Sequence, residues 1–253
     1  MNGEPAYVRT MFGSIARRYD FANHVLSCGI DFYWRAYAAD IVADWQPGKI
    51  ADLATGTGDL ALALQKKLPH ADITGVDFLP EMLELARQKG VRHVVLADAM
   101  KLPFPEGSFD CVTIAFGLRN LESYSTGLTE ICRVLKTNGH LLVLEFSLPS
   151  MPMLRAAYRF YLHHCVPLLG SCLTQSKSAY DYLAESIEQF PSGNAMCDFM
   201  RAKGYDSPSF EPLSGGIVTI YTAAKRRRRW EKPQKGESPL PQPGNRATKN
   251  LRD

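Results

Sequence analysis

Between residues 49 and 147, short apolar runs alternate with segments whose apolar residues recur at helical spacing. The apolar runs cover residues 50–54, 73–76, 94–97, 111–116 and 141–146. The helical segments cover residues 59–68, 80–89 and 123–136. Short, nearly continuous apolar runs are typical of strands buried on both faces, and strands that alternate with helices form parallel sheets. The alternation therefore predicts a doubly wound α/β fold, in which helices cover both faces of a mostly parallel sheet.

The segments on either side of this core complete the predicted domain organisation. Residues 1–48 show helical spacing and are expected to form helices on the substrate side of the sheet. Residues 148–205 form an aromatic-rich helical insertion, expected to act as a lid. Residues 206–224 contain two strand-like runs joined by a glycine pair, which predicts an antiparallel hairpin at the end of a seven-stranded sheet. Residues 225–253 are basic and proline-rich, so we expect them to be disordered.

The net charge of +3 is divided unevenly along the chain. Residues 225–253 contain ten Lys or Arg against three Asp or Glu, a net charge of +7. The rest of the chain contains 19 Lys or Arg against 23 Asp or Glu, a net charge of −4, so we expect no nucleic-acid partner for the body. Five consecutive cations at 225–229 precede Trp230. Such a segment is typical of a solubilising tail and also of one that adheres to an anionic membrane.

The composition also bears on the compartment. No window approaches the about 20 apolar residues of a membrane span, and the N-terminus lacks the features of a secretory signal. The six cysteines show no metal-binding spacing. We therefore expect a cytoplasmic protein with reduced thiols and no metal, either free or peripheral at the inner face of the cytoplasmic membrane. A homodimer is compatible with the sequence.

A turn that contains two glycines follows the first predicted strand. Gly56 and Gly58 would let a ligand approach the backbone, and the helix that follows presents free N–H groups at its N-terminus. Asp77 ends the second predicted strand, where its carboxylate can accept hydrogen bonds from both hydroxyls of a ribose. Asp98 ends the third strand, where it can face an adenine amino group. The arrangement predicts a nucleotide-type cofactor at this edge of the sheet.

Two classes of enzyme have such a loop. Residues 56–61 fit the dinucleotide fingerprint, so an NAD-dependent dehydrogenase is an alternative. Residues 98–110, in which a carboxylate and a Leu-Pro-Phe segment precede a Phe-Asp pair, resemble class I methyltransferases instead, and residues 133–142 resemble the same class. A dehydrogenase also needs a second mononucleotide-binding half, for which the hairpin leaves no room. The resemblance favours a Rossmann-like, S-adenosylmethionine-binding core at residues 49–147.

Further motifs narrow the family. They lie at residues 12–35, at 115–120 with the sequence Ala-Phe-Gly-Leu-Arg-Asn, at 180–191 and at 213–218. Together they resemble the ubiquinone/menaquinone biosynthesis C-methyltransferase family, over about residues 8–225. The resemblance implies methyl transfer from S-adenosylmethionine to a ring carbon of a demethylated isoprenoid quinol. Demethylmenaquinol is the first expectation, and the benzoquinol precursor of ubiquinone or another aromatic acceptor is the alternative.

The resemblance also implies which residues bind the cofactor. Together with the glycine loop, it makes these residues the candidates: Asp52, Gly56, Thr57, Gly58, Asp77, Asp98, Ala99 and Ala115. Members of the family often have Ser where this chain has Ala115, so one hydrogen bond to the cofactor is expected to be absent or supplied by the backbone.

A quinol carbon becomes nucleophilic when the neighbouring hydroxyl loses its proton, so the site needs a group that takes the proton or stabilises the oxyanion. Arg119 follows the fourth predicted strand, where it would stabilise a phenolate; a structural ion pair is the alternative. Tyr19, Asp20 and Tyr180 are candidates for a proton relay, although Tyr19 also fits a core aromatic residue.

The insertion contains an amphipathic helix, predicted at residues 154–166. One stripe of this helix contains Leu154 and Leu162, and another contains Arg155 and Arg159. The pattern predicts a helix that packs on the domain, or a lid over a lipid tail that contacts the membrane, and the two roles are compatible.

Overall fold

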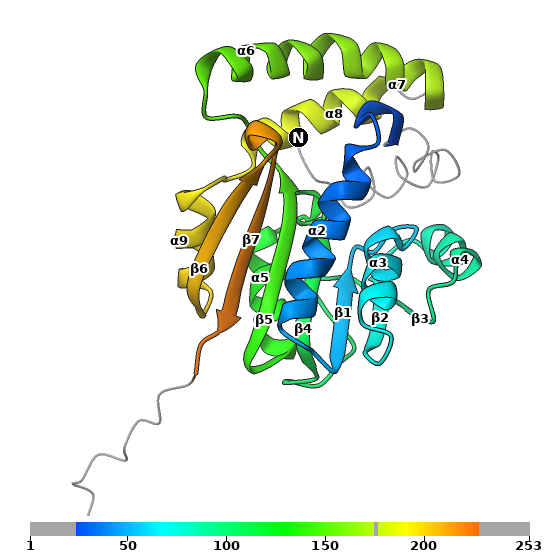
Figure 1. The fold of residues 1–253 in the computed structure, drawn as a ribbon, viewed down its shortest axis with the longest axis vertical. Coiled ribbons are helices and arrows are strands. Elements are labelled where there is room, and N and C mark those ends of the chain that lie inside the picture. Colours follow the sequence, from blue (N-terminus) through cyan, green and yellow to red (C-terminus); the bar gives the residue numbers. More distant parts are fainter. Residues whose placement is uncertain (1–23, 175–176, 228–253) are drawn as a thin grey trace, which may run out of the picture.

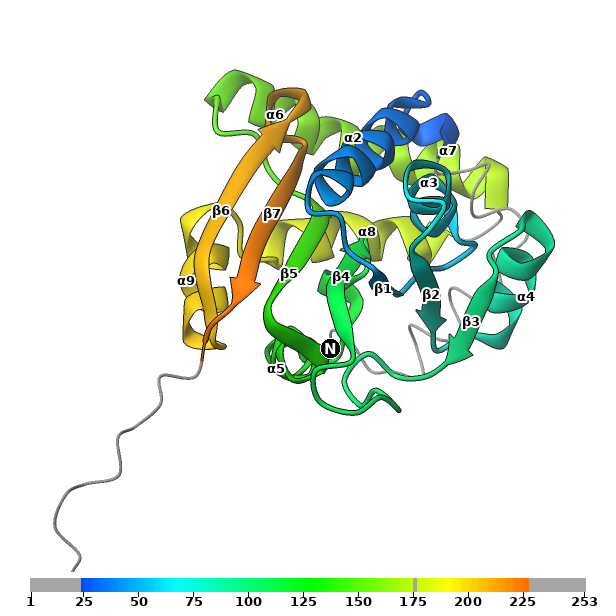
Figure 2. The ribbon, with the colours of Figure 1, turned by 60° about the horizontal axis from the view of Figure 1, so that its bottom comes forward.

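The computed structural model describes residues 24–174 and 177–227. Its strands form one seven-stranded sheet of order β3-β2-β1-β4-β5-β7-β6, which Figure 2 shows side by side. The strands are β1 (Lys49–Leu53), β2 (Asp72–Asp77), β3 (His93–Leu96), β4 (Phe109–Ala115), β5 (Leu135–Phe146), β6 (Tyr205–Leu213) and β7 (Val218–Lys225). Strands β1 to β5 are parallel, whereas β7 pairs antiparallel with β5 and with β6. The predicted mostly parallel sheet with a terminal antiparallel hairpin is confirmed.

Each face of the sheet has its own apolar core, and each core is covered by helices. The helices around the sheet are α2 (Ile30–Asp44), α3 (Asp59–Lys67), α4 (Pro80–Lys89), α5 (Tyr124–Val134) and α9 (Asn194–Ala202). One core joins the sheet to α2 and α3 and includes Trp34 and Leu64. The other joins it to α5 and α9 and includes Leu128 and Met200. Figure 1 shows α2 in front of the sheet and α5 behind it.

The strand order reverses between β1 and β4. Strand β1 pairs with β2 on one side, where Leu53 is opposite Val76, and with β4 on the other, where Leu53 is opposite Ile114. The chain leaves β1 toward β2 and leaves β4 toward β5, so the two connections diverge. In open α/β sheets a crevice forms at the carboxyl ends of the strands at such a point, and ligands bind there.

The insertion lies over the carboxyl ends of the parallel strands, at the top of Figure 1. It contains α6 (Pro152–Phe160), the π-helical turn η2 (Tyr161–Cys165), α7 (Val166–Thr174) and α8 (Lys177–Gln189). These helices share a third apolar core. The predicted insertion at 148–205 extends further than this layer, because α9 packs on the sheet instead. Only the part up to α8 is placed to cover a site.

The helix predicted at 154–166 is part of a longer helical run with a π-helical turn in its middle. Pro167 is the second residue after that turn. Proline has no N–H for the carbonyl of His163, and its ring would collide with that carbonyl in a regular helix, which accounts for the wider turn. Sequence periodicity alone does not show this local widening. Within this turn, the Tyr161 hydroxyl donates to the carbonyl oxygen of Leu26 at 2.7 Å, which ties the insertion to the segment before α2.

The C-terminal boundary differs from the prediction. Strand β7 continues to Lys225, whose Nζ donates to the carbonyl oxygen of Leu135 at 2.8 Å. Arg226 pairs with Asp206 at 2.7 Å, and Arg227 donates to the Asn138 side chain. The first three cations of the basic run therefore contact the folded body, because backbone pairing continues beyond the apolar part of the strand. The remainder of the predicted tail lies outside the described residues.

In the described ranges, no helix combines the length and the apolar composition that crossing a membrane would require.

Candidate active site at the carboxyl edge of the sheet

A cavity of about 490 Å³ lies where the strand order reverses, between the loops of the sheet and the helical insertion. Its volume is in the usual range for small-molecule sites. The loops after β1, β2, β3 and β4 supply polar groups and backbone. The insertion supplies apolar and aromatic side chains, which include Leu154, Tyr158 and Leu162. The predicted apolar stripe of the insertion helix therefore faces the cavity.

The cavity brings together most of the predicted cofactor residues. Seven of the eight line it: Asp52, Gly56, Thr57, Asp77, Asp98, Ala99 and Ala115. Gly58 is not among the lining residues and instead begins α3 with a φ of 90°. A Cβ added at Gly58 would lie 2.4 Å from Cγ2 of Val91, so the glycine permits close helix packing. At Gly56 an added Cβ would meet nothing within 4 Å, which leaves the backbone open to a ligand.

The carboxylate of Asp77 is fixed beside the glycine loop. Its Oδ2 accepts a hydrogen bond from the Gly56 N–H at 2.9 Å, and its Oδ1 accepts one from the Leu79 N–H at 3.0 Å. Burial raises the pKa of Asp77, and these N–H groups oppose that effect. Asp98, one strand further along the edge, is exposed and accepts a hydrogen bond from the Met100 N–H at 2.8 Å.

Asp52 lies deeper, at the end of β1. It is buried, and its carboxylate accepts hydrogen bonds from the hydroxyls of Thr55 at 2.6 Å and Thr113 at 2.7 Å. Burial raises its pKa to about 6. Thr113 belongs to β4, so Asp52 also links the two strands between which the order reverses. A cationic ligand in the cavity would favour the ionised form of Asp52.

Arg119 lines the cavity and is also part of a buried ion pair. Its Nη1 lies 2.5 Å from Oε1 of Glu145, at the end of β5, and donates to the Phe116 carbonyl oxygen at 2.7 Å. The guanidinium also lies over the ring of Phe146 at 5.3 Å. Both interpretations of Arg119 are therefore compatible with its position, because the structural pair fixes a positive charge at the wall of the cavity.

Asn120 is a candidate that the sequence analysis did not single out, although it ends the motif at 115–120. Its amide nitrogen donates to the Phe116 carbonyl oxygen at 3.2 Å. Its Oδ1 is buried and accepts no hydrogen bond from the part of the chain that the structure describes. Buried polar atoms normally have a partner, so an acceptor left over beside a cavity indicates a ligand that donates to it.

Of the other three predicted catalytic residues, the structure describes one, Tyr180. Tyr180, on α8, is buried and lines the cavity beneath the insertion. Tyr19 and Asp20 lie outside the described residues.

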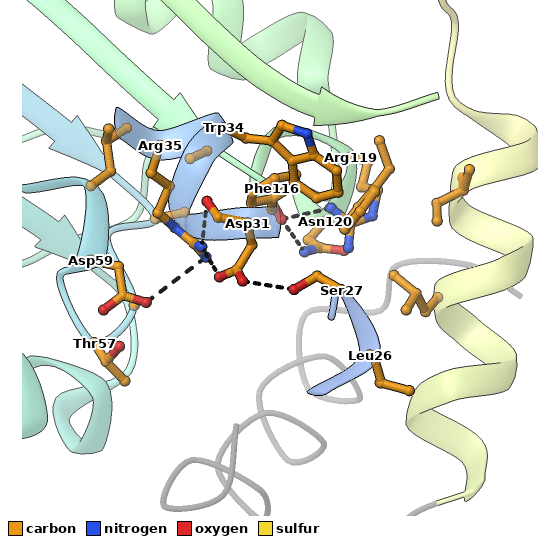
Figure 3. Close-up of a pocket in the computed structure, with 18 of the residues that line it drawn as sticks. Leu26, Ser27, Asp31, Trp34, Arg35, Thr57, Asp59, Phe116, Arg119 and Asn120 are labelled. Atoms are coloured by element: carbon orange, nitrogen blue, oxygen red, sulfur yellow. Dashed lines mark hydrogen bonds and ion pairs between the residues drawn. The ribbon is translucent and has the colours of Figure 1, made fainter. Parts of the chain in front are cut away.

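A second group missed from the sequence lies at the start of α2. Asp31 is buried and pairs with Arg35 one turn later, and Ser27 donates to it at 2.7 Å. Both Asp31 and Arg35 line the cavity, and Figure 3 shows Arg35 between Asp31 and Asp59. The spacing of four residues between an acid and a base was the available signal, but such pairs are usually surface features.

Comparison with known proteins agrees with this architecture. A model of the ubiE/COQ5 methyltransferase family matches residues 1–225. Among solved structures, a SAM-dependent methyltransferase from Thermotoga maritima aligns with a TM-score of 0.64 at 19% identity, covering 87% of this chain and 100% of that one. Human N-acetylserotonin methyltransferase in complex with SAM aligns with a TM-score of 0.61 at 20% identity, covering 86% of this chain and 58% of that one. At these identities the likeness shows the fold.

Sequence relatives are much more similar. Demethylmenaquinone methyltransferase of Thermus thermophilus is 45% identical, over 83% of this chain and 98% of the relative. The protein of the same name from Deinococcus radiodurans is 42% identical, over 87% of this chain and 92% of the relative. Ubiquinone/menaquinone biosynthesis C-methyltransferase UbiE of Geobacter sp. strain M21 is 42% identical, over 86% of this chain and 96% of the relative. The family match and these identities lead to one conclusion: the chain belongs to the ubiE/COQ5 methyltransferase family.

Proposed function

We propose that this protein transfers a methyl group from S-adenosylmethionine to a ring carbon of a demethylated isoprenoid quinol. The observation that carries the proposal is the composition of the cavity at the strand reversal. One wall consists of polar loops suited to a nucleoside, the opposite wall is apolar, and a buried arginine lies between them. Two relatives named for demethylmenaquinone make demethylmenaquinol the preferred acceptor.

The residues of the polar wall suit the methyl donor. Asp77 would accept hydrogen bonds from the ribose hydroxyls, and Asp98 would receive the adenine amino group. Gly56 leaves space for the donor above the backbone. When bound, S-adenosylmethionine supplies an electrophilic methyl group, so the protein has mainly to orient the acceptor and exclude water.

The arginine between the walls suits the acceptor. A quinol hydroxyl that donates to Asn120 Oδ1 would satisfy the buried acceptor there. As that hydroxyl loses its proton, Arg119 would stabilise the oxyanion, and the neighbouring ring carbon becomes the nucleophile. A carbon–carbon bond to the donated methyl group would then form as the sulfur–methyl bond breaks, and loss of the ring proton would restore the aromatic ring. Tyr180 and, outside the described residues, Tyr19 and Asp20 are the candidates for the proton relay.

Purified protein with labelled S-adenosylmethionine tests the substrate. We expect label to be transferred to demethylmenaquinol, less to the benzoquinol precursor of ubiquinone, and none to a simple catechol, which lacks the isoprenoid tail that the apolar wall would bind. NAD should not bind. Transfer to the catechol alone, or to none of these acceptors, would contradict the proposal.

Removing the charge of Arg119 tests its role in the reaction. Replacing Arg119 alone would leave the Glu145 carboxylate buried without its cation and would destabilise the fold. The double variant Arg119→Gln/Glu145→Gln avoids this problem. We expect kcat to fall roughly 100-fold to 1,000-fold, as when other oxyanion-stabilising donors are removed, with little change in the Kd of S-adenosylhomocysteine. A parallel loss of kcat and cofactor affinity, with stability retained, would instead make Arg119 a cofactor-binding residue.

We further propose that the insertion contacts an anionic membrane, from which an isoprenoid acceptor must come. The helical run opposite the cavity exposes large apolar side chains: Met153 is 82% exposed, Leu168 66% and Phe160 60%. Between Glu145 and Asp181 the chain contains no acidic residue, whereas Arg155 and Arg159 are exposed on α6. Arg159 pairs with Glu188 of α8 at 2.7 Å, and an apolar surface flanked by these two arginines suits a negatively charged lipid surface. The basic tail beyond Arg227 would add attraction.

Vesicle co-sedimentation separates the membrane contact of the insertion from that of the basic tail. We expect full-length protein to bind anionic vesicles, and Met153→Ser/Phe160→Ser to lower that affinity roughly tenfold because two apolar side chains no longer enter the interface. Leu96→Ser on β3, 56% exposed and away from α6 and α7 in Figure 1, is the matched control and should bind as wild type. A chain ending at Arg227 measures the contribution of the tail.

Unchanged binding by Met153→Ser/Phe160→Ser would contradict the contact through the insertion. If light scattering shows that this variant turns a dimer into a monomer, a second copy of the chain covers the surface instead. Equal binding by the full chain and the chain ending at Arg227 would discard the tail.

A further inference from the structure

Two arginines line the cavity, and they differ in how far their hydrogen bonds are used. The donors of Arg119 reach the Glu145 carboxylate, the Phe116 carbonyl oxygen and, at 3.3 Å from Nε, the Ser186 hydroxyl. Arg35 donates through Nη1 to Asp31 alone among the described residues. Its Nη2 lies 3.9 Å from Oδ2 of Asp59, too far for a hydrogen bond. One edge of the Arg35 guanidinium is thus held, and the other remains available.

The held edge is fixed firmly. Asp31 accepts from the Ser27 hydroxyl at 2.7 Å and lies 2.7 Å from His24 Nδ1. Burial acts to raise the pKa of Asp31, but the hydrogen bond from Ser27, the charge of Arg35 and the hydrogen bond with His24 hold it below its usual value. Asp31 therefore stays ionised near neutral pH, as a permanent partner for Arg35. The guanidinium also lies 5.3 Å from the centre of the Phe116 ring.

The position of Arg35 along the sheet edge indicates its ligand. In strand order, the edge presents Asp98 after β3, Asp77 at the end of β2, Asp59 beyond β1 and Phe116 after β4. If the first two receive the adenosyl part of the methyl donor, the amino-acid part extends toward the last two. Arg35 lies between Asp59 and Phe116 (Figure 3).

We propose that the available edge of Arg35 binds the carboxylate at the methionine end of the methyl donor. The inference rests on the proposed function and goes beyond it by assigning this end of the ligand. A guanidinium edge matches a carboxylate through two parallel hydrogen bonds, which an ammonium cannot make. Two acids nearby, Asp52 and Asp59, suit the ammonium group of the same ligand better than its carboxylate, although Asp59 also pairs with Lys89. Arg35 supplies the opposite charge, and Asp31 acts as its positioning residue.

Two ligands that differ only at this end test the assignment. S-adenosylhomocysteine contains the carboxylate, whereas 5′-methylthioadenosine retains the adenosine and sulfur but lacks the amino-acid part. By calorimetry on the full chain, we expect Arg35→Gln to weaken S-adenosylhomocysteine roughly tenfold to 100-fold, the range for hydrogen bonds to charged groups. The affinity for 5′-methylthioadenosine should stay within about twofold of wild type. Arg35→Lys should recover only part of the lost affinity for S-adenosylhomocysteine, because an ammonium group cannot make the two parallel hydrogen bonds of a guanidinium.

Two controls exclude a general effect on the fold. Arg119→Gln/Glu145→Gln alters the other cavity arginine and should leave both affinities near wild type. Asp31→Asn/Arg35→Gln removes both charges of the pair, so it should show the same selective loss as Arg35→Gln without leaving a buried carboxylate unpaired.

An equal loss of affinity for both ligands in the Arg35 variants would make Arg35 a structural residue. Unchanged affinity for S-adenosylhomocysteine would place the carboxylate of the ligand elsewhere. Either result overturns the assignment. If wild-type protein bound neither ligand, the proposed function itself would fail, which is a distinguishable result.

Discussion

The reversal of strand order between β1 and β4 is the constraint on which the rest of the structure depends. Because the chain leaves these neighbouring strands in opposite directions, their carboxyl ends cannot be closed by their own connections. Everything at the site is arranged around that opening. The glycine loop and Asp77 form one side, Arg119 and Asn120 follow β4 on the other, and the insertion covers the top. A donor with a nucleoside end and an acceptor with a ring can therefore meet in one cavity.

Burying ions is costly, and this cost explains why the buried charged groups of the site have ion-pair or hydrogen-bond partners. Arg119 has Glu145, and Arg35 has Asp31, so neither guanidinium is free to reorient. Asp52 has no cation in direct contact among the residues that the structure describes; it keeps two hydroxyl donors and a raised pKa. The site thus holds its charges in place before any ligand arrives, which is how preorganised electrostatic stabilisation works.

Periodicity and loop chemistry predicted the parts that are encoded locally. The strands and the hairpin each follow from a few neighbouring residues, and the structure confirms them. The glycine loop lines the cavity, and its role in binding the cofactor stays a prediction. The Arg35–Asp31 pair was not predicted, and an ion pair of Arg119 was an alternative whose partner, Glu145, was not predicted. A charged residue in the sequence does not reveal that it is buried or what faces it. Gly58 matched the cofactor motif, yet helix packing explains why a glycine is needed there. A Cβ at this position would collide with Val91, which only the fold brings close. Local rules predicted more of the residues that line the cavity on the glycine-loop side than on the Arg119 side.

The arrangement of the cavity is expected to direct the methyl group to carbon. Turnover of demethylmenaquinol with 13C-methyl-labelled S-adenosylmethionine, followed by NMR of the extracted product, measures this directly. The geometry of a fixed arginine beside a quinol hydroxyl predicts that the labelled methyl resonance belongs to a carbon on the ring, with the hydroxyl left unmodified. A labelled methyl on oxygen would show that the hydroxyl, rather than the ring carbon, is the nucleophile, and would contradict the account.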